Sequence, residues 1–206
     1  MQRPTVVFAS AQLLTDDVWA PQVEAFAPDY DVVLADHGRD DTIAGMAARL
    51  LAAAPGSFHL IAHAMGGFTA FEVMRQQPER VLSLVLIATL APNDGPAQTE
   101  RRQGYIRLVE AGRFDQVVEE RVPILLPPHR REERPLLARV RQMAADTGAE
   151  RFLAQQRAIM SRIDSRPSLP AIRNRCQSAP QCSPSSWTTR SSGSRASLMG
   201  RARTQL

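Results

Sequence analysis

The chain has 206 residues, a hydrophobic content of 44% and a net charge of +4, which suits one domain with a buried core. No run of about 20 apolar residues occurs, so we expect no membrane span. The N-terminus lacks a signal-peptide pattern, so we expect a cytoplasmic protein. Cys176 and Cys182 are too few and too oddly spaced for a disulfide scaffold or a zinc site, and we expect no metal and no cofactor.

The positive charge is concentrated at the C-terminal end. Residues 173–206 contain six arginines and no acidic residue, so the preceding part of the chain is slightly acidic. A basic tail can bind nucleic acid or a membrane surface. No aromatic stacking pattern or basic helix face accompanies these arginines, so nucleic acid is not an expected partner.

Residues 1–90 alternate strand-like and helix-like segments. The pattern predicts strands over residues 5–9, 31–35, 59–63 and 81–87, and helices over residues 19–26, 42–53 and 66–77. Thr42 is the expected N-cap of the second helix. Continuous apolar strands separated by helices indicate a parallel sheet covered on both faces, with its ligand site beyond the carboxyl ends of the strands. Gln12 and Ala64 both fall just past strand ends.

Residues 96–165 lose this alternation and show helical periodicity. We expect helices over 97–111, 114–121, 132–147 and 149–161, separated at Gly112, Pro123, the Pro127–Pro128 pair and Gly148. Such an insertion after a sheet strand predicts a helical cap over the site, although helices packed on the side of the sheet are an alternative. From Asn174 onward no periodicity is left, and we expect no regular structure there.

Four motifs occur in a family-like order. Ser10-Ala11-Gln12-Leu13-Leu14 follows the first strand, and Asp36-His37-Gly38-Arg39 follows the second. Ala62-His63-Ala64-Met65-Gly66-Gly67 is similar to G-H-S-M-G-G, and Pro78-Glu79-Arg80-Val81 precedes an apolar strand. In these motifs the chain resembles the α/β-hydrolase superfamily over roughly residues 4–172, which implies a parallel sheet with helices on both faces plus a helical cap.

The resemblance implies a nucleophile elbow formed by Ala62, His63, Ala64 and Gly66, in which a serine attacks a carbonyl carbon. Here Ala64 occupies the serine position, and its methyl group cannot attack. His63 is expected to point into supporting structure. The family order places the acid and the histidine after the nucleophile, yet the only later histidine is His129, on an expected surface segment. No catalytic acid or base is therefore identifiable.

The oxyanion hole of this family is built from backbone N–H groups, so it tolerates side-chain changes. By position, the two donors would be Gln12 and Met65. Met65 begins a helix, whose N-terminus favours negative charge. The alternative for Gln12 is a plain surface-loop residue.

The family pattern stops near residue 174, where relatives continue with a strand that carries the catalytic acid. One allowed choice of codons for residues 178–189 encodes a family-like strand in another reading frame, so we hypothesise a frameshift near residue 174, which sequencing of the gene would test. The strand over residues 81–87 would then form an exposed edge, at which copies of the chain could associate.

These expectations divide the chain into an α/β core (1–95), a helical cap (96–165) and an aberrant or disordered basic tail (166–206). The leading hypothesis is a serine-type hydrolase of a small ester, amide or related acyl substrate that is catalytically impaired in this chain. A non-catalytic small-molecule binding module and a basic-tail interaction protein are the alternatives.

Overall fold

A five-stranded, fully parallel sheet forms the centre of the molecule. The computed structural model describes residues 3–172 and 175–179, and the strand order is β2-β1-β3-β4-β5. The strands are β1 (Thr5–Ala9), β2 (Asp31–Leu34), β3 (Phe58–His63), β4 (Val81–Ile87) and β5 (Arg175–Ala179). The helices are α1 (Ala20–Phe26), α2 (Ile43–Ala53), α3 (Met65–Gln76), α4 (Pro96–Glu110), α5 (Phe114–Leu125) and α6 (Arg134–Ser161).

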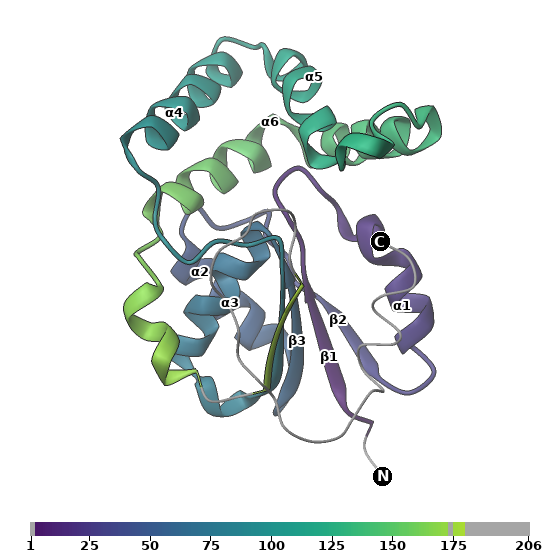
Figure 1. Ribbon diagram of the computed structural model, residues 1–206, viewed down its shortest axis with the longest axis vertical. Coiled ribbons are helices and arrows are strands. Elements are labelled where there is room, and N and C mark those ends of the chain that lie inside the picture. Colours follow the sequence, from purple (N-terminus) through teal and green to yellow (C-terminus); the bar gives the residue numbers. More distant parts are fainter. Residues whose placement is uncertain (1–2, 173–174, 180–206) are drawn as a thin grey trace.

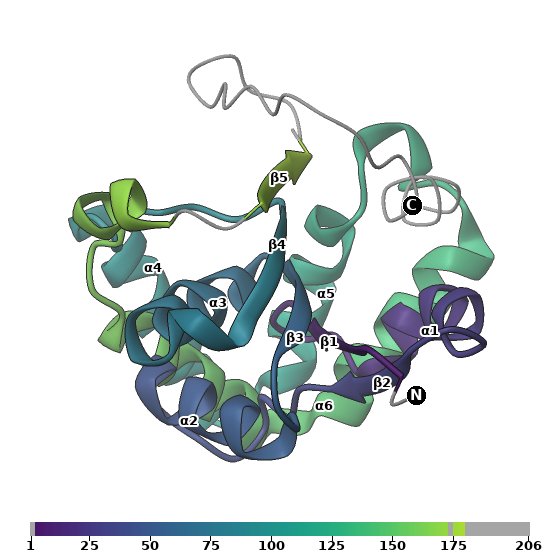
Figure 2. The same cartoon turned by 90° about the horizontal axis from the view of Figure 1, so that it is seen from below.

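Helices cover both faces of the sheet, as its apolar strands require. In Figure 2, α2 and α3 lie on one side and α1 lies on the other. On the α2/α3 side, one cluster buries Val7, Leu60 and Phe71, whereas the opposite cluster buries Val6, Phe8 and Phe26. Thr42 accepts a hydrogen bond from the Gly45 N–H at 3.1 Å and so caps α2, as predicted. The predicted strands and core helices are thus confirmed to within a few residues.

Helices α4, α5 and α6 form a separate layer beyond the carboxyl ends of the strands (Figure 1). We call these three helices the helical layer. The layer has its own apolar core, which includes Val117, Val140 and Phe152 and continues onto Leu13 of the loop after β1. The alternative of helices packed on the side of the sheet does not fit this placement.

One glycine and one proline act differently in this layer. Gly148 has φ 72° and ψ 169°, so α6 consists of two helical segments joined at the residue where the sequence predicted a break. The predicted end of α5 at Arg121 is wrong, because the helix continues through Pro123 to Leu125. Proline cannot donate a backbone hydrogen bond, and α5 ends within two residues of it, so the cost falls on the last turn.

The sheet does not end at β4. The sequence predicted no regular structure after Asn174, but residues 175–179 form β5, which pairs in parallel with β4 from Ser83 to Ile87. The expectation that β4 would be an exposed edge is therefore wrong. The frameshift hypothesis concerns residues that lie almost entirely outside the described part of the chain and stays a prediction.

A buried ion cluster ties the helical layer to the sheet. Asp94, in the connection from β4 to α4, pairs with Arg162 at 2.7 Å and with Arg102 on α4, and its side chain is 6% exposed. Arg162 also lies 4.3 Å above the Phe68 ring of α3 and donates to the Pro92 carbonyl. Burial alone would raise the pKa of Asp94, but the hydrogen bonds from Arg162 and Arg102 outweigh it and leave the pKa below its ordinary value.

Removing the shared carboxylate should therefore be costly. We expect Asp94→Asn to lower the free energy of unfolding by about 3 kcal/mol, because it leaves two guanidinium groups without their common anion. Urea denaturation measures the loss. Glu100→Gln, which breaks the exposed pair with Arg107, is the matched control and should cost less than about 1 kcal/mol. Equal effects of the two substitutions would contradict the role given to Asp94.

Candidate functional site

The sharp turn between β3 and α3 centres on Ala64. Its backbone has φ 49° and ψ −105°, a conformation that non-glycine residues seldom adopt. The Ala64 N–H donates to the Ile87 carbonyl of β4 at 2.9 Å, and the Ala64 carbonyl accepts from Thr89 Oγ1 at 2.8 Å and from the Gly67 N–H at 3.0 Å. All of these hydrogen bonds use the Ala64 backbone and none uses its side chain, so the alanine methyl is accommodated without loss of geometry.

Two glycines allow α3 to start this close to the sheet. A Cβ on Gly66 would lie 2.2 Å from the Ala9 carbonyl oxygen, and one on Gly67 would lie 2.3 Å from Thr89 Oγ1. Both distances are far below van der Waals contact, so only glycine fits. Met65, the first residue of α3, is buried, and its N–H belongs to the first helical turn, which has no intrahelical acceptor.

The structure describes all four histidines of the sequence. His63 lies edge-on to Trp19, with ring centroids 6.4 Å apart. His59 is hydrogen-bonded to Ser83, His37 to the Ser10 carbonyl, and His129 is on an exposed turn. Burial lowers the pKa of both His59 and His63, so their rings favour the neutral form.

The loop after β1 reaches the helical layer through two glutamines of α6. The Leu13 N–H donates to Gln155 Oε1 at 3.3 Å, and Gln156 Nε2 donates to Gln12 Oε1 at 3.5 Å. Leu13 has φ 63°, which turns its N–H toward α6. Gln12 is buried, so the alternative of a surface-loop residue is wrong. Sequence reasoning missed Leu13, because nothing in an apolar loop residue indicates a positive φ.

Hydrogen bonds also join the loops that follow β1 and β2. Ser10 Oγ accepts from Trp19 Nε1 at 3.0 Å, and the Ser10 carbonyl lies 3.3 Å from Nδ1 of the buried His37. If His37 is neutral with its proton on Nδ1, that nitrogen donates to the carbonyl. Burial lowers the pKa of His37 to about 4, although the bond to Ser10 opposes the shift.

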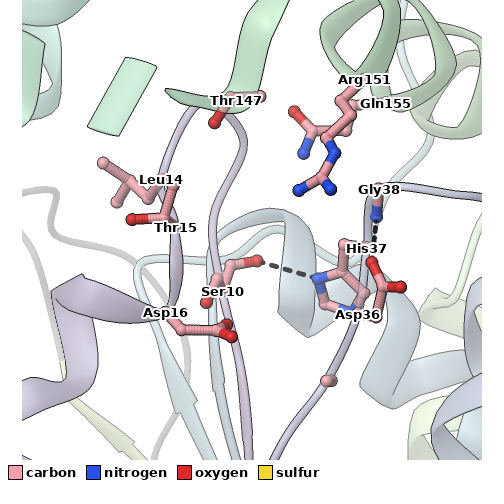
Figure 3. Close-up of a pocket in the computed structure, with 11 residues that line it drawn as sticks. Ser10, Leu14, Thr15, Asp16, Asp36, His37, Gly38, Thr147, Arg151 and Gln155 are labelled. Atoms are coloured by element: carbon pink, nitrogen blue, oxygen red, sulfur yellow. Dashed lines mark hydrogen bonds between the residues drawn. The ribbon is translucent and has the colours of Figure 1, made fainter. Parts of the chain in front are cut away.

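A cavity of about 330 Å³ lies between these loops and α6 (Figure 3). The core contributes Ser10, Asp16, Asp36 and His37, and α6 contributes Thr147, Arg151 and Gln155. Ala64 is not among the lining residues; its side chain packs instead against the apolar cluster of the helical layer. Sequence reasoning did not assign a role to Asp16, Asp36 or Arg151, because their meeting depends on how α6 crosses the two loops.

The comparison with protein families identifies the family to which the chain belongs. The family description for the alpha/beta hydrolase fold matches residues 4–134. The chain belongs to this family. Within it, the chain is 37% identical over 90 residues to "Putative carbamate hydrolase RutD" of Azorhizobium caulinodans, covering 37% of this chain and 34% of that protein. The same-named protein of Rhizobium rhizogenes is 33% identical over 100 residues, covering 40% and 37%. These matches span only about a third of each relative.

Solved structures show the same fold. A thermophilic esterase from Thermogutta terrifontis superposes with a TM-score of 0.74 at 23% identity, covering 86% of this chain and 71% of that chain. The enol-lactonase from Burkholderia xenovorans gives a TM-score of 0.73 at 18% identity, covering 86% and 72%. At such identities the likeness concerns the fold alone. In the described residues, no helix has the length and apolarity to cross a bilayer, and no cluster of metal-ligand side chains occurs.

The close approach at Gly66 yields a stability prediction. Gly66→Ala should lower the free energy of unfolding by at least about 3 kcal/mol, because its methyl group overlaps a backbone carbonyl that cannot move without displacing β1. Chemical denaturation measures this. The control is Gly104→Ala in α4, where the nearest atom to a new Cβ is 3.9 Å away. That substitution should stabilise by up to about 1 kcal/mol. A neutral Gly66→Ala would contradict the tight contact.

His37 yields a prediction about pH. Its folded pKa, about 4, is below the ordinary value near 6.5, so the unfolded chain binds the proton more tightly. The stability associated with neutral His37 is present above pH 6.5 and is lost as the pH falls toward 4, by up to about 3 kcal/mol. Denaturation curves between pH 7.5 and 4 should show a shallower decline for His37→Gln. His129→Gln, on the exposed turn, is the control. Identical pH slopes for wild type and His37→Gln would contradict the assignment.

Proposed function

We propose that this chain has the scaffold of a serine-type hydrolase for a small ester, amide or related acyl substrate, and that it is itself catalytically impaired. Residue 64 occupies the position of the attacking serine, with Ala62, His63 and Gly66 completing the elbow. The helical layer serves as the cap over the substrate. The names of the relatives, a carbamate hydrolase, an esterase and an enol-lactonase, support an acyl or carbamoyl carbon as the centre of attack.

The observation that carries this proposal is the turn at Ala64. Its positive φ and the close approach allowed by Gly66 form a strand-to-helix corner typical of a nucleophile elbow. An alanine methyl has no lone pair and no proton to transfer, so covalent attack from this position is impossible. Of the four histidines in these 206 residues, three make other contacts and His129 is on an exposed turn, so we expect that a serine here would still lack its general base.

The oxyanion site is proposed at backbone N–H groups of the loop after β1 and at the start of α3. Met65 and Gln12 are the donors expected by position, and Leu13 adds an N–H that is already directed at an amide oxygen, Gln155 Oε1. That amide oxygen has the same acceptor chemistry as a substrate carbonyl oxygen. A small acyl substrate could therefore replace it with little rearrangement of the loop.

A test separates the missing nucleophile from the missing base. We expect Ala64→Ser to hydrolyse p-nitrophenyl acetate no more than about tenfold faster than the unchanged chain, because loss of triad members typically costs about 10⁴ to 10⁶ in turnover. Release of p-nitrophenol in steady state, with a single-turnover burst measured separately, distinguishes acylation from deacylation. Rapid multiple turnover by Ala64→Ser would show that a base is present and overturn the claim that it is missing, whereas turnover by the unchanged chain would overturn the proposed impairment.

A non-catalytic binding module is the second candidate. The cavity between the β1 and β2 loops and α6 supports it, since a preformed cavity with several convergent polar groups is the usual form of a small-molecule site. The third possibility, a basic-tail interaction protein, concerns residues that lie mostly outside the described part of the chain. Cytoplasmic location and self-association likewise stay predictions.

A further inference from the structure

The cavity of Figure 3 contains two opposite charges that do not pair with each other. Arg151 extends from α6 on one wall, and Asp16 extends from the loop after β1 on the other. Neither side chain has a recorded hydrogen bond or ion pair with another described residue. The other carboxylate of the cavity, Asp36, is already engaged by Arg39 at 2.9 Å and by the Gly38 N–H at 2.9 Å. Asp16 and Arg151 are therefore the two uncommitted charges.

Asp16 and Arg151 stay apart even though α6 is attached directly to the loop after β1. The neighbouring residue Asp17 does form a direct pair with α6, through Arg139 Nε at 2.8 Å, and its carbonyl accepts from Arg139 Nη2 at 2.8 Å. The Leu13 N–H bond to Gln155 holds the same two elements at a second point. The spacing across the cavity is thus fixed on both sides of the unpaired charges.

Both charges could be stabilised further by a ligand. Partial burial raises the pKa of Asp16 and the negative charge of Asp36 raises it further, whereas the positive charge of Arg151 opposes the shift only in part, so a cationic or N–H donor group beside Asp16 would be stabilised. The side chain of Arg151 packs over Gly38, where a new Cβ would lie 3.0 Å from its Cδ and 3.1 Å from its Nε, so the stem is positioned and the two terminal nitrogens of the guanidinium group are left for a ligand. Guanidinium groups bind carboxylates through two parallel hydrogen bonds.

We propose that this cavity binds a small zwitterion, with its ammonium or other N–H donor group on Asp16 and its carboxylate on Arg151. A volume of about 330 Å³ is ample for a small amino acid. Thr147, Ser10 and Gln155 line the space between the two charges and offer polar contacts to the middle of the ligand. The inference goes beyond the proposed hydrolase function and needs no turnover at residue 64.

The experiment is a titration of the full chain at low salt with a length series of zwitterions: glycine, β-alanine, 4-aminobutyrate and 6-aminohexanoate. Propionate and propylammonium, each with a single charge, are the ligand controls. Binding is followed by calorimetry and by ligand-observed NMR. We expect one member of the series to bind at least tenfold more tightly than either control. Because both cavity charges are accessible to solvent, added salt should weaken the binding.

Matched variants locate the site. Asp16→Asn and Arg151→Gln should each weaken binding of the preferred zwitterion at least tenfold, whereas Asp41→Asn and Arg157→Gln, which alter other exposed charges, should leave it unchanged. Both cavity side chains are exposed to solvent, and circular dichroism confirms that each variant is folded. Combining Asp16→Arg with Arg151→Asp exchanges the two charges and should restore part of the lost affinity.

Several results would overturn the proposal. They are equal binding of single-charge and zwitterionic ligands, no binding of any zwitterion at tens of millimolar, and affinities that do not change in Asp16→Asn and Arg151→Gln. A strong stabilising coupling between Asp16 and Arg151 in the absence of ligand would also overturn it, because the two side chains would then be closing on each other. Inactivity of Ala64→Ser affects the hydrolase proposal and leaves this one standing.

Discussion

The contact between the start of α3 and the ends of β1 and β4 is the constraint on which the rest of the structure depends. Gly66 brings the helix against the Ala9 carbonyl, and Gly67 brings it against Thr89, which in turn hydrogen-bonds to Ala64. A helix that starts this close forces the preceding residue into a positive φ. The corner at residue 64 is therefore a consequence of glycine packing, and the side chain of residue 64 contributes nothing to it.

The geometry of this corner is therefore independent of which small side chain stands at residue 64. A serine hydroxyl at this corner would be held in place by backbone geometry, and removing it leaves every recorded hydrogen bond of the turn intact. The Ala64 methyl also packs against the apolar cluster of the helical layer. Burial of that methyl favours alanine slightly over serine, since a hydroxyl without a partner would be costly there.

Much of the sheet could be predicted from sequence because its strands are short apolar runs bounded by Gly, Pro and capping residues such as Thr42. The break at Gly148 could be predicted for the same reason. Three features of the fold could not be predicted from the sequence. The extension of α5 through Pro123 depends on packing in the helical layer, β5 lacks an apolar run and pairs with β4, and the positive φ of Leu13 has no local signal. In each case tertiary contacts outweigh local propensity.

The polar side chains of the candidate site were even harder to predict from local sequence. Asp16 and Arg151 are 135 positions apart, and each reads as an ordinary surface charge in its own segment. They line the same cavity because Asp94 anchors the helical layer from the β4 side, while Arg139 and Gln155 hold α6 over the loop after β1. With α6 fixed at both places, two side chains that could have neutralised each other are kept apart. Water solvates both charges in the empty protein, and the proposed zwitterion would replace that water with two complementary charges. In the proposed zwitterion site, the attachment of α6 would thus contribute to selectivity along with the two charges.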